Sequence, residues 1–170
     1  VTGTNGKTTV TYLLKTVLEQ TLQAKVGLIG TIQNMIGDAA LPTERTTPES
    51  YELQRLFRQM RDAGCTHVIM EVSSHALVLG RVEGIQFDTG IFTNLTQDHL
   101  DFHKTMEAYR DAKTMLFTRC KKGVFNLDDP ASTYMMRKST CSCTTYSAER
   151  NDATLTARFI KLRSDHIEMD

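Results

Sequence analysis

Apolar residues follow two different periods along this chain, and their alternation predicts strands separated by helices. Short apolar runs bounded by turn residues are typical of strands that are covered on both faces of a sheet, and they occupy residues 26–33, 67–72, 87–95 and 123–127. Apolar residues that recur every three or four positions are typical of amphipathic helices, and they occupy residues 7–21, 47–64 and 105–117.

Several residues mark where these elements should begin and end. Thr47 followed by Pro48 predicts a helix start, because threonine caps free N–H groups and proline suits a first turn. Gly64 should end that helix, and Thr105 should cap the next one. Strand-like alternation near the C-terminus, with a turn at residues 164–165, predicts a small β-hairpin.

The order of these elements predicts the fold class and the place of a site. Alternating strands and helices favour an α/β fold with an open, mostly parallel sheet flanked by helices, formed by one domain of residues 1–170. Ligands of such sheets bind at the carboxyl ends of the strands. Glu71 and the segment from Asn94 to His99 follow two predicted strands. We therefore expect these residues to lie beside a bound ligand.

Composition narrows the class of protein. Twenty basic residues balance twenty acidic residues among 170, so no overall field favours nucleic acid, and no run of apolar residues is long enough to span a membrane. The four cysteines include one CxC at residues 141–143 but no second pair or histidines suited to zinc. We interpret them as reduced thiols of a cytoplasmic protein.

The first residues carry the strongest chemical signal. Gly3 and Gly6 allow backbone N–H groups to curl around a phosphate, Lys7 adds a positive charge, and Thr8 offers a hydroxyl to magnesium. The usual phosphate loop has a further glycine where Val1 stands, so an ordinary glycine-rich turn before a helix remains an alternative. Because the chain begins inside this loop, we expect a piece of a longer protein.

Three further side chains are candidates for the same site, each with a plainer alternative. Glu71 needs a cation, a donor or a metal if it is buried, and an ion pair with Arg81 or Lys113 would serve equally well. His99 lies near acidic residues, as many capping histidines do. Lys113 falls on a predicted helix and could be a solvated surface lysine.

The combination of motifs resembles the ATP-dependent Mur ligases of bacterial cell-wall synthesis. The segments that carry the resemblance cover nearly the whole chain in order: TGTNGKTT, TTPES, MEVSSHAL with RV after it, TNLTQDHLDFH and YRDAK. Within that family they are most similar to the ligases that add the third amino acid of the peptide stem. Folylpolyglutamate synthetase is similar in its phosphate loop, but the TTP and SSHAL segments fit it less well.

The resemblance implies a nucleotide and two metal ions. It places ATP phosphates on the opening loop, at Gly3, Thr4, Asn5, Gly6, Lys7, Thr8 and Thr9, with Asn94 near the nucleotide. It implies that Thr8 and Glu71 share one Mg²⁺, and that His99 and a carbamylated Lys113 hold a second. A carbamate supplies an anionic oxygen ligand where a protonated lysine would repel the metal.

The resemblance also implies an acceptor substrate, UDP-MurNAc-L-Ala-D-Glu. Its contacts would be Thr46, Thr47, Ser73 and Arg81. Relatives often carry a glutamine two residues before that arginine, whereas this chain has Leu79, which puts one contact in doubt. Arg45 stands where relatives differ, so it receives no role.

The implied reaction is amide formation with lysine or diaminopimelate through an acyl phosphate, catalysed by Lys7, Glu71, His99 and Lys113 with Mg²⁺. The resemblance further implies an N-terminal UDP-binding domain and a C-terminal amino-acid-binding domain outside these residues, and we expect a monomer. A small kinase with a phosphate loop is an alternative, although no arginine-rich lid is present. A domain that is inactive without its partners is another.

Overall fold

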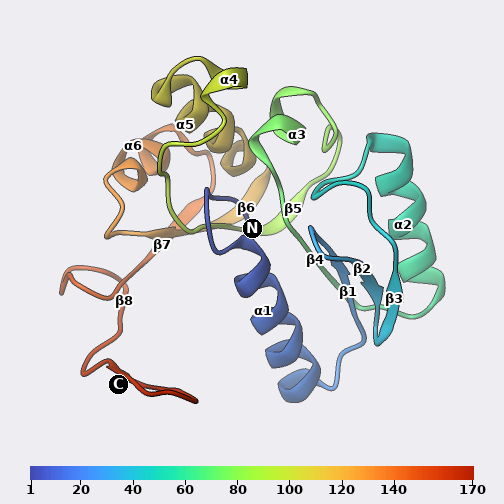
Figure 1. Ribbon diagram of the computed structural model, residues 1–170, viewed down its shortest axis with the longest axis horizontal. Coiled ribbons are helices and arrows are strands. Elements are labelled where there is room, and N and C mark those ends of the chain that lie inside the picture. The colour runs from blue at the N-terminus through green and yellow to red at the C-terminus, as the bar shows by residue number, and fades with distance from the viewer.

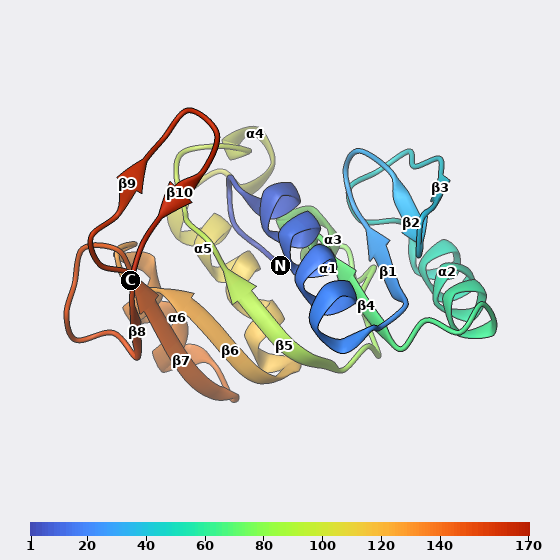
Figure 2. The same ribbon diagram turned by 90° about the horizontal axis from the view of Figure 1, so that it is seen from below.

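Two four-stranded sheets form the centre of the molecule (Figures 1 and 2). The computed structural model describes all residues, 1–170. The strands of the first sheet lie in the order β3 (Ala39–Leu41), β2 (Asn34–Ile36), β1 (Val26–Ile29) and β4 (His67–Met70). The strands of the second lie in the order β5 (Phe87–Phe92), β6 (Cys120–Asn126), β7 (Ser142–Ser147) and β8 (Leu155–Thr156).

The first two residues of the chain join these sheets edge to edge. The Val1 nitrogen donates to the Met70 carbonyl at 2.8 Å, and the Thr2 N–H donates to the Ile91 carbonyl at 2.8 Å. Thr2 forms a parallel bridge with Phe92. β1 pairs in parallel with β4, and β5 to β8 are parallel throughout, whereas β2 and β3 are antiparallel. The predicted open, mostly parallel sheet is confirmed.

Helices cover both faces of this sheet (Figures 1 and 2). They are α1 (Lys7–Leu22), α2 (Ser50–Asp62), α3 (Ser74–Val78), α4 (Leu100–His103), α5 (Met106–Thr114) and α6 (Ala131–Lys138), with a 3₁₀ turn at Met115–Thr118. α1 lies on one face, and α5 and α6 lie on the opposite face (Figures 1 and 2). No helix combines the length and apolar character needed to cross a lipid bilayer.

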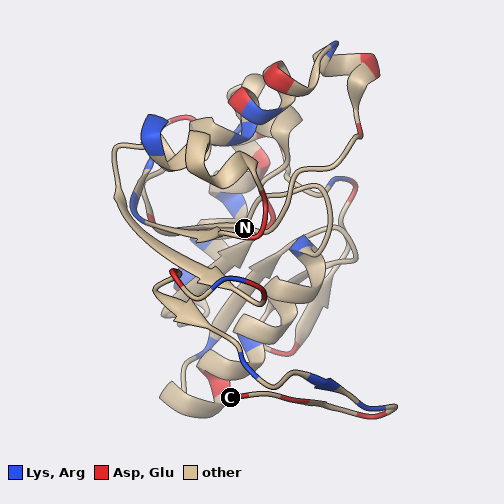
Figure 3. Ribbon diagram, turned by 90° about the vertical axis from the view of Figure 1, so that its left-hand side faces the viewer, with Lys and Arg blue, Asp and Glu red and all other residues tan.

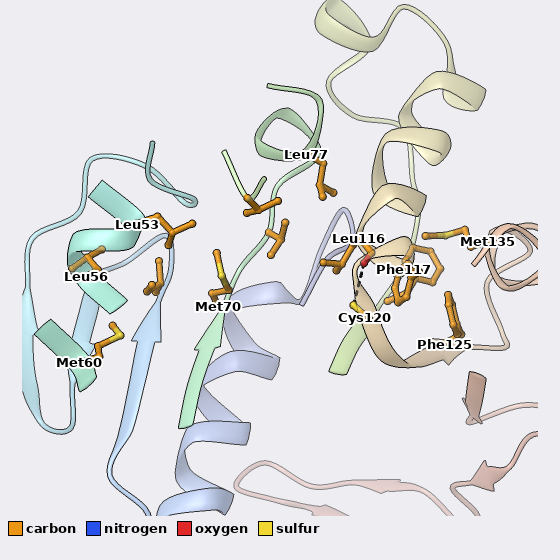
Figure 4. Close-up of a cluster of buried hydrophobic side chains, with 14 residues drawn as sticks. Leu53, Leu56, Met60, Met70, Leu77, Leu116, Phe117, Cys120, Phe125 and Met135 are labelled. Carbon is orange, nitrogen blue, oxygen red and sulfur yellow. Dashed lines mark hydrogen bonds between the residues drawn. The ribbon is translucent and has the colours of Figure 1, made fainter. Parts of the chain in front are cut away.

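The hydrophobic core extends along the sheet from α2 to α6 (Figure 4). Leu53 and Met60 on α2 are fully buried, as are Phe117 and Phe125 at the other end. The Phe117 and Phe125 rings lie with their centroids 4.3 Å apart. Glycine at position 27 makes room for α2, because a Cβ there would lie 2.5 Å from the Met60 sulfur. Helix and sheet can therefore pack closely at this point.

Two of the three predicted helix-end residues agree with the structure, and one is wrong. Thr105 caps α5 by accepting a hydrogen bond from the Ala108 N–H at 3.1 Å, and Gly64 follows α2 with a φ of 83°. Thr47 does not cap α2, which begins at Ser50 after Glu49. The Thr47 hydroxyl donates instead to the Glu71 carbonyl at 2.9 Å, so a tertiary contact outweighs the local cap.

The strands predicted at residues 26–33, 67–72 and 87–95 end earlier in the structure, at Ile29, Met70 and Phe92. The strand predicted at residues 123–127 spans Cys120–Asn126. The C-terminal hairpin is confirmed as β9 (Lys161–Leu162) and β10 (Ile167–Glu168), which pair antiparallel. Basic residues lie on its first arm and acidic residues on its returning arm (Figure 3), and Arg163 lies 3.3 Å from Glu168.

Candidate functional site

The opening loop has the backbone that a phosphate site requires. Gly3 has a φ of 151° and Gly6 a φ of 82°, a region that side chains disfavour. A Cβ at Gly3 would lie 1.9 Å from the Thr93 hydroxyl oxygen. Glycine at position 3 is therefore required both by the backbone angle and by the close approach of the Thr93 segment.

The segment after β5 fixes this loop in place. The Asn94 side chain accepts from the Asn5 N–H at 2.9 Å and donates to the Asn5 carbonyl at 3.2 Å. The Thr93 hydroxyl donates to the same carbonyl at 2.7 Å, and the Thr4 hydroxyl accepts from the Thr96 N–H at 3.0 Å. Asn94, predicted to lie near the nucleotide, thus lies against the loop itself.

The N-terminus of α1 points its free N–H groups toward the loop. Gly6 is the N-cap and provides no side-chain cap, and the first turn of α1 carries no acidic residue. This end of the helix therefore retains its positive dipole for an external anion. Thr9, in the same turn, is exposed.

Lys7 folds back over the loop that precedes it. Its amine donates to the Gly3 carbonyl at 3.0 Å and to the Thr4 carbonyl at 2.8 Å. Burial lowers the pKa of Lys7, although the nearby Glu71 carboxylate counteracts this shift. An amine held by two carbonyl oxygens beside a helix N-terminus is placed to meet an anion.

Glu71 is fully buried directly after β4, at the same edge of the sheet. Its carboxylate accepts from the Thr8 hydroxyl at 3.0 Å, from the Thr31 N–H at 3.0 Å and from the Thr31 hydroxyl at 3.0 Å. An ion pair with Arg81 or Lys113, the alternative left open by the sequence, is wrong: Arg81 pairs with Glu49, and the Lys113 amine contacts a backbone carbonyl. Hydroxyl and amide donors satisfy Glu71 instead.

Lys113 is buried, not a solvated helix lysine, and only 1% of it is exposed. Its amine donates to the Gly3 carbonyl at 2.9 Å and lies 4.3 Å from the centre of the Tyr109 ring. Burial, followed by the charge of Lys7, lowers the pKa of Lys113 to about 7. A large fraction of this amine is therefore uncharged near neutral pH.

His99 makes no hydrogen bond to the loop, whereas Glu71 bonds to Thr8 and Lys113 bonds to Gly3. It takes a left-handed backbone with a φ of 53°, and its side chain is 47% exposed. Its Nε2 lies 3.5 Å from the Asp98 carboxylate, and its ring meets that of His75 edge-on at 5.0 Å. No group of three or more His, Cys, Asp or Glu side chains gathers closely enough to hold a metal by itself.

The residues predicted to bind an acceptor line one cavity beside Glu71. This cavity has a volume of about 410 Å³ and is lined by Thr31, Thr43, Glu44, Arg45, Thr46, Thr47, Ser73, His75, Arg81 and His99. Arg81 donates to the Thr47 carbonyl at 3.1 Å and lies 2.8 Å from Glu49, which also pairs with Arg45. No hydrophobic residue lines the cavity, whose side chains carry hydroxyl, carboxylate, guanidinium and imidazole groups.

Two residues that the sequence did not single out hold this site together. Tyr109 is fully buried, and its hydroxyl lies 3.3 Å from the Thr4 hydroxyl. Thr31 donates twice to Glu71 and lies 3.0 Å from the Thr46 hydroxyl. Tyr109 belongs to the YRDAK segment and could have been found there, whereas a threonine in a turn gives no signal of its own.

The donor set suits magnesium better than a softer metal. The Thr8 hydroxyl and the Glu71 carboxylate present hard oxygen ligands beside the loop. Magnesium is usually bound by one or two carboxylates, phosphate oxygens and water, so it needs no dedicated protein cage. The buried amine of Lys113, with its lowered pKa, is suited to reaction with carbon dioxide because carbamate formation requires the neutral amine.

Comparison with known proteins identifies relatives over the whole chain. Residues 1–170 match the family described as the Mur ligase middle domain. The chain is 56% identical over 147 residues to UDP-N-acetylmuramoyl-L-alanyl-D-glutamate–2,6-diaminopimelate ligase of Caldanaerobacter subterraneus, which covers 86% of this chain and 30% of the relative. It is 48% identical to the ligase of that name from Clostridium botulinum, over 100% of this chain and 35% of the relative. The chain thus spans about a third of the length of these relatives.

Solved structures agree with this match. A structure of UDP-N-acetylmuramoyl-L-alanyl-D-glutamate–2,6-diaminopimelate ligase superposes with a TM-score of 0.90 at 31% identity, over 99% of this chain and 35% of that one. MurF ligase from Thermotoga maritima, solved in complex with ADP, gives a TM-score of 0.68 at 17% identity, over 99% and 36% of the two chains. The second likeness shows the fold alone.

Proposed function

Because this chain belongs to the Mur ligase family, we propose that it is the central ATP-binding domain of a ligase that extends UDP-MurNAc-L-Ala-D-Glu by one amino acid. One observation carries the proposal. Glu71 is hydrogen-bonded to Thr8 on the phosphate loop and, through Thr31, to Thr46 in the polar cavity. A carboxylate shared in this way links a nucleotide site to an acceptor site.

The nucleotide site consists of the loop and the first turn of α1. Backbone N–H groups between Gly3 and Thr9 would receive the phosphates of ATP, and Asn94 would keep the loop in shape. Lys7 would exchange its two carbonyl contacts for phosphate oxygens. Its role is to neutralise charge on the transferred phosphoryl group.

Two magnesium ions would complete this site. Thr8 and Glu71 would hold one, and His99 with carbamylated Lys113 would hold the other. The metals would supply positive charge that offsets the negative charge of the phosphoryl oxygens. The amines of Lys7 and Lys113 both donate to the Gly3 carbonyl, which places both beside the phosphate loop. Burial lowers the pKa of Lys113, which favours the neutral amine that carbamate formation requires.

The acceptor would occupy the polar cavity. Arg81 is suited to an anionic group of the dipeptide, and Glu49 holds its guanidinium in position. Ser73 and Thr46 would contact the peptide. Thr47 is fully buried and gives its hydroxyl proton to the Glu71 carbonyl, so it shapes the cavity and places the backbone around Ser73.

The reaction needs no protein nucleophile. A carboxylate oxygen of the acceptor attacks the γ-phosphorus, the bond to the bridging oxygen breaks, and ADP leaves with that electron pair. The amino acid's nitrogen then attacks the acyl carbon, phosphate leaves, and the nitrogen loses a proton to give the amide. The chain contributes by aligning the reactants and by stabilising charge at the phosphoryl group.

The diaminopimelate ligases among the relatives favour diaminopimelate as the added amino acid. We infer that further domains bind the uridine end and the amino acid, since the chain spans a third of those relatives. We call the longer protein that contains this chain the complete ligase. A cytoplasmic location and a monomeric state stay predictions.

The test measures ATP hydrolysis and product mass with purified complete ligase and with the 170-residue chain alone. The substrates are UDP-MurNAc-L-Ala-D-Glu with diaminopimelate, with lysine, or with neither. We expect ADP, phosphate and a tripeptide product only when the complete ligase has acceptor and diaminopimelate together, and no product from the chain alone.

Other outcomes separate the alternatives. Activity with a folate and glutamate would favour a folylpolyglutamate synthetase-like ligase. A phosphorylated acceptor that no amine converts to an amide would favour a kinase. Product formation with no requirement for the nucleotide would overturn the proposal.

A further inference from the structure

Four oxygen-bearing groups form a continuous hydrogen-bonded chain between the two halves of the site. The Thr46 hydroxyl lies 3.0 Å from the Thr31 hydroxyl, which lies 3.0 Å from one Glu71 carboxylate oxygen. The Thr8 hydroxyl reaches the same carboxylate at 3.0 Å and 3.1 Å. The chain starts in the half-buried cavity wall at Thr46 and ends on the phosphate loop.

The direction of each bond in this chain follows from the number of protons available. A hydroxyl has one proton to donate, and a carboxylate can only accept. The Thr31 proton therefore goes to Glu71, and the contact between Thr31 and Thr46 can be made only by the Thr46 proton. Thr46 is left with lone pairs facing the cavity and no proton to offer.

The Ser73 hydroxyl, in contrast to that of Thr46, keeps a proton that it can donate. Its hydroxyl oxygen accepts from the Ala76 N–H at 3.2 Å as the cap of α3. The Thr47 proton goes to the Glu71 carbonyl at 2.9 Å, which is much closer than the Ser73 oxygen at 3.5 Å. The Ser73 proton thus faces the cavity together with the guanidinium of Arg81.

We propose that Thr31 is a positioning residue which orients the Glu71 carboxylate and makes Thr46 a hydrogen-bond acceptor in the cavity. This inference rests on the proposed function and deepens it. The ligand of the cavity then carries an N–H or O–H group toward Thr46 and a carbonyl or carboxylate oxygen toward Ser73 and Arg81. A peptide bond next to a carboxylate has this pattern, whereas a bare phosphate does not.

The same series of hydrogen bonds should couple the binding of the acceptor to the binding of magnesium. A donor from the acceptor substrate polarises the Thr46 hydroxyl, which strengthens the bond to Thr31 and then the bond to Glu71. Glu71 in turn holds its orientation toward the metal that Thr8 shares. Acceptor binding should therefore tighten magnesium binding, and magnesium should tighten acceptor binding by the same factor.

The experiment uses the complete ligase with four single variants and one double variant, Thr31→Val with Thr46→Val. Thr31→Val keeps the shape and the backbone N–H but removes the hydroxyl, Thr31→Ser keeps the hydroxyl, and Thr46→Val removes the other end of the chain. Thr21→Val is the control, because it removes an exposed hydroxyl at the end of α1 that bonds to the Val17 carbonyl. Calorimetry measures the affinity for ADP and the affinity for UDP-MurNAc-L-Ala-D-Glu, each with and without Mg²⁺.

Loss of a hydrogen-bond partner behind a metal ligand typically costs about tenfold in metal affinity, so we expect Thr31→Val to weaken Mg²⁺ binding to the ADP complex by about tenfold. Thr31→Ser should recover within about twofold, and metal-free ADP affinity should stay unchanged in every variant. Thr46→Val should weaken acceptor binding. The double variant with Thr31→Val should lose less acceptor affinity than the product of the losses in the two single variants.

The proposal is overturned if Thr31→Val binds Mg²⁺ as the wild type does, if Thr31→Ser is as weak as Thr31→Val, or if the two effects simply multiply. If Thr31→Val does not fold, the acceptor's effect on Mg²⁺ affinity is compared between the single variants Thr46→Val, which lacks one end of the hydrogen-bonded series, and Thr31→Ser, which retains all of it. A wild type that binds Mg·ADP but not the UDP-linked dipeptide would contradict the proposed function, while the Mg²⁺ measurement would still test Thr31.

Discussion

Burial of the Lys113 amine should leave a pH signature in the stability of the chain. The amine is 1% exposed, contacts the Gly3 carbonyl and the Tyr109 ring, and has a pKa lowered from 10.5 to about 7 by burial. In the unfolded chain this amine regains its ordinary pKa. Between these two pKa values the unfolded chain binds more protons, so the free energy of unfolding rises with pH.

The size of the effect follows from that shift. One pKa unit corresponds to about 1.4 kcal/mol, so the protonation penalty on the folded state is about 4 kcal/mol at a pH of about 7 and about 2 kcal/mol at a pH of about 9. Lys113→Met removes the penalty at both pH values. The stability advantage of Lys113→Met over the wild type should therefore shrink by about 2 kcal/mol across this window.

Urea unfolding of the 170-residue chain in CO₂-free buffers measures this difference directly. Lys122→Met serves as the matched control, because Lys122 is exposed on β6 and should show no such pH dependence. Adding bicarbonate should stabilise the wild type, through carbamate formation, but not Lys113→Met. A stability difference between Lys113→Met and wild type that stays constant over the window would refute the reasoning.

Four further substitutions test other parts of the account. Lys7→Ala should abolish ATP turnover by the complete ligase with little change in its unfolding midpoint, and acyl-phosphate formation at the wild-type rate would contradict the role of Lys7. Gly3→Ala should destabilise the chain by about 2–3 kcal/mol in urea, because a Cβ there would lie 1.9 Å from the Thr93 hydroxyl oxygen; an unchanged midpoint would contradict this. Lys113→Ala should lose ligase activity that acetate partly restores, whereas full activity without acetate would make the lysine structural only. Phe125→Ala should cost about 3–5 kcal/mol by leaving a core cavity, and a loss below about 1 kcal/mol would contradict the packing described.

The sequence predicted those features that depend on local pattern. The helix α1, the strand β4 and the glycines of the loop depend on patterns within a few residues, and each is present. The apolar period of α1 does not mark its buried face, because Leu13 and Val17 are 61% and 51% exposed whereas Thr11 and Lys15 are buried. Val68 on β4 is 41% exposed, so the prediction that this strand is covered on both faces is wrong.

Val1 and Thr2 were too short a segment to indicate a strand, yet their backbone bonds join the two sheets. That junction depends on residues 70 and 92, which are far away in the sequence.

Side-chain partners were harder to predict than elements. Thr47 looked like a helix cap because cap and tertiary contact use the same hydroxyl, and only the fold decides between them. Glu71 was correctly expected to need partners, but two threonines from other segments provide them rather than an arginine or a lysine. Parallel strand ends bring such residues together, and no spacing along the chain records this.

The central claim is that the phosphate loop and the polar cavity serve one reaction, in which an acceptor carboxylate attacks ATP. The most direct test supplies the complete ligase with UDP-MurNAc-L-Ala-D-Glu labelled with ¹⁸O in the reacting carboxylate, and analyses the released phosphate by mass spectrometry. The account predicts one ¹⁸O atom in each phosphate released during amide formation. Unlabelled phosphate accompanying the same amide product would contradict it.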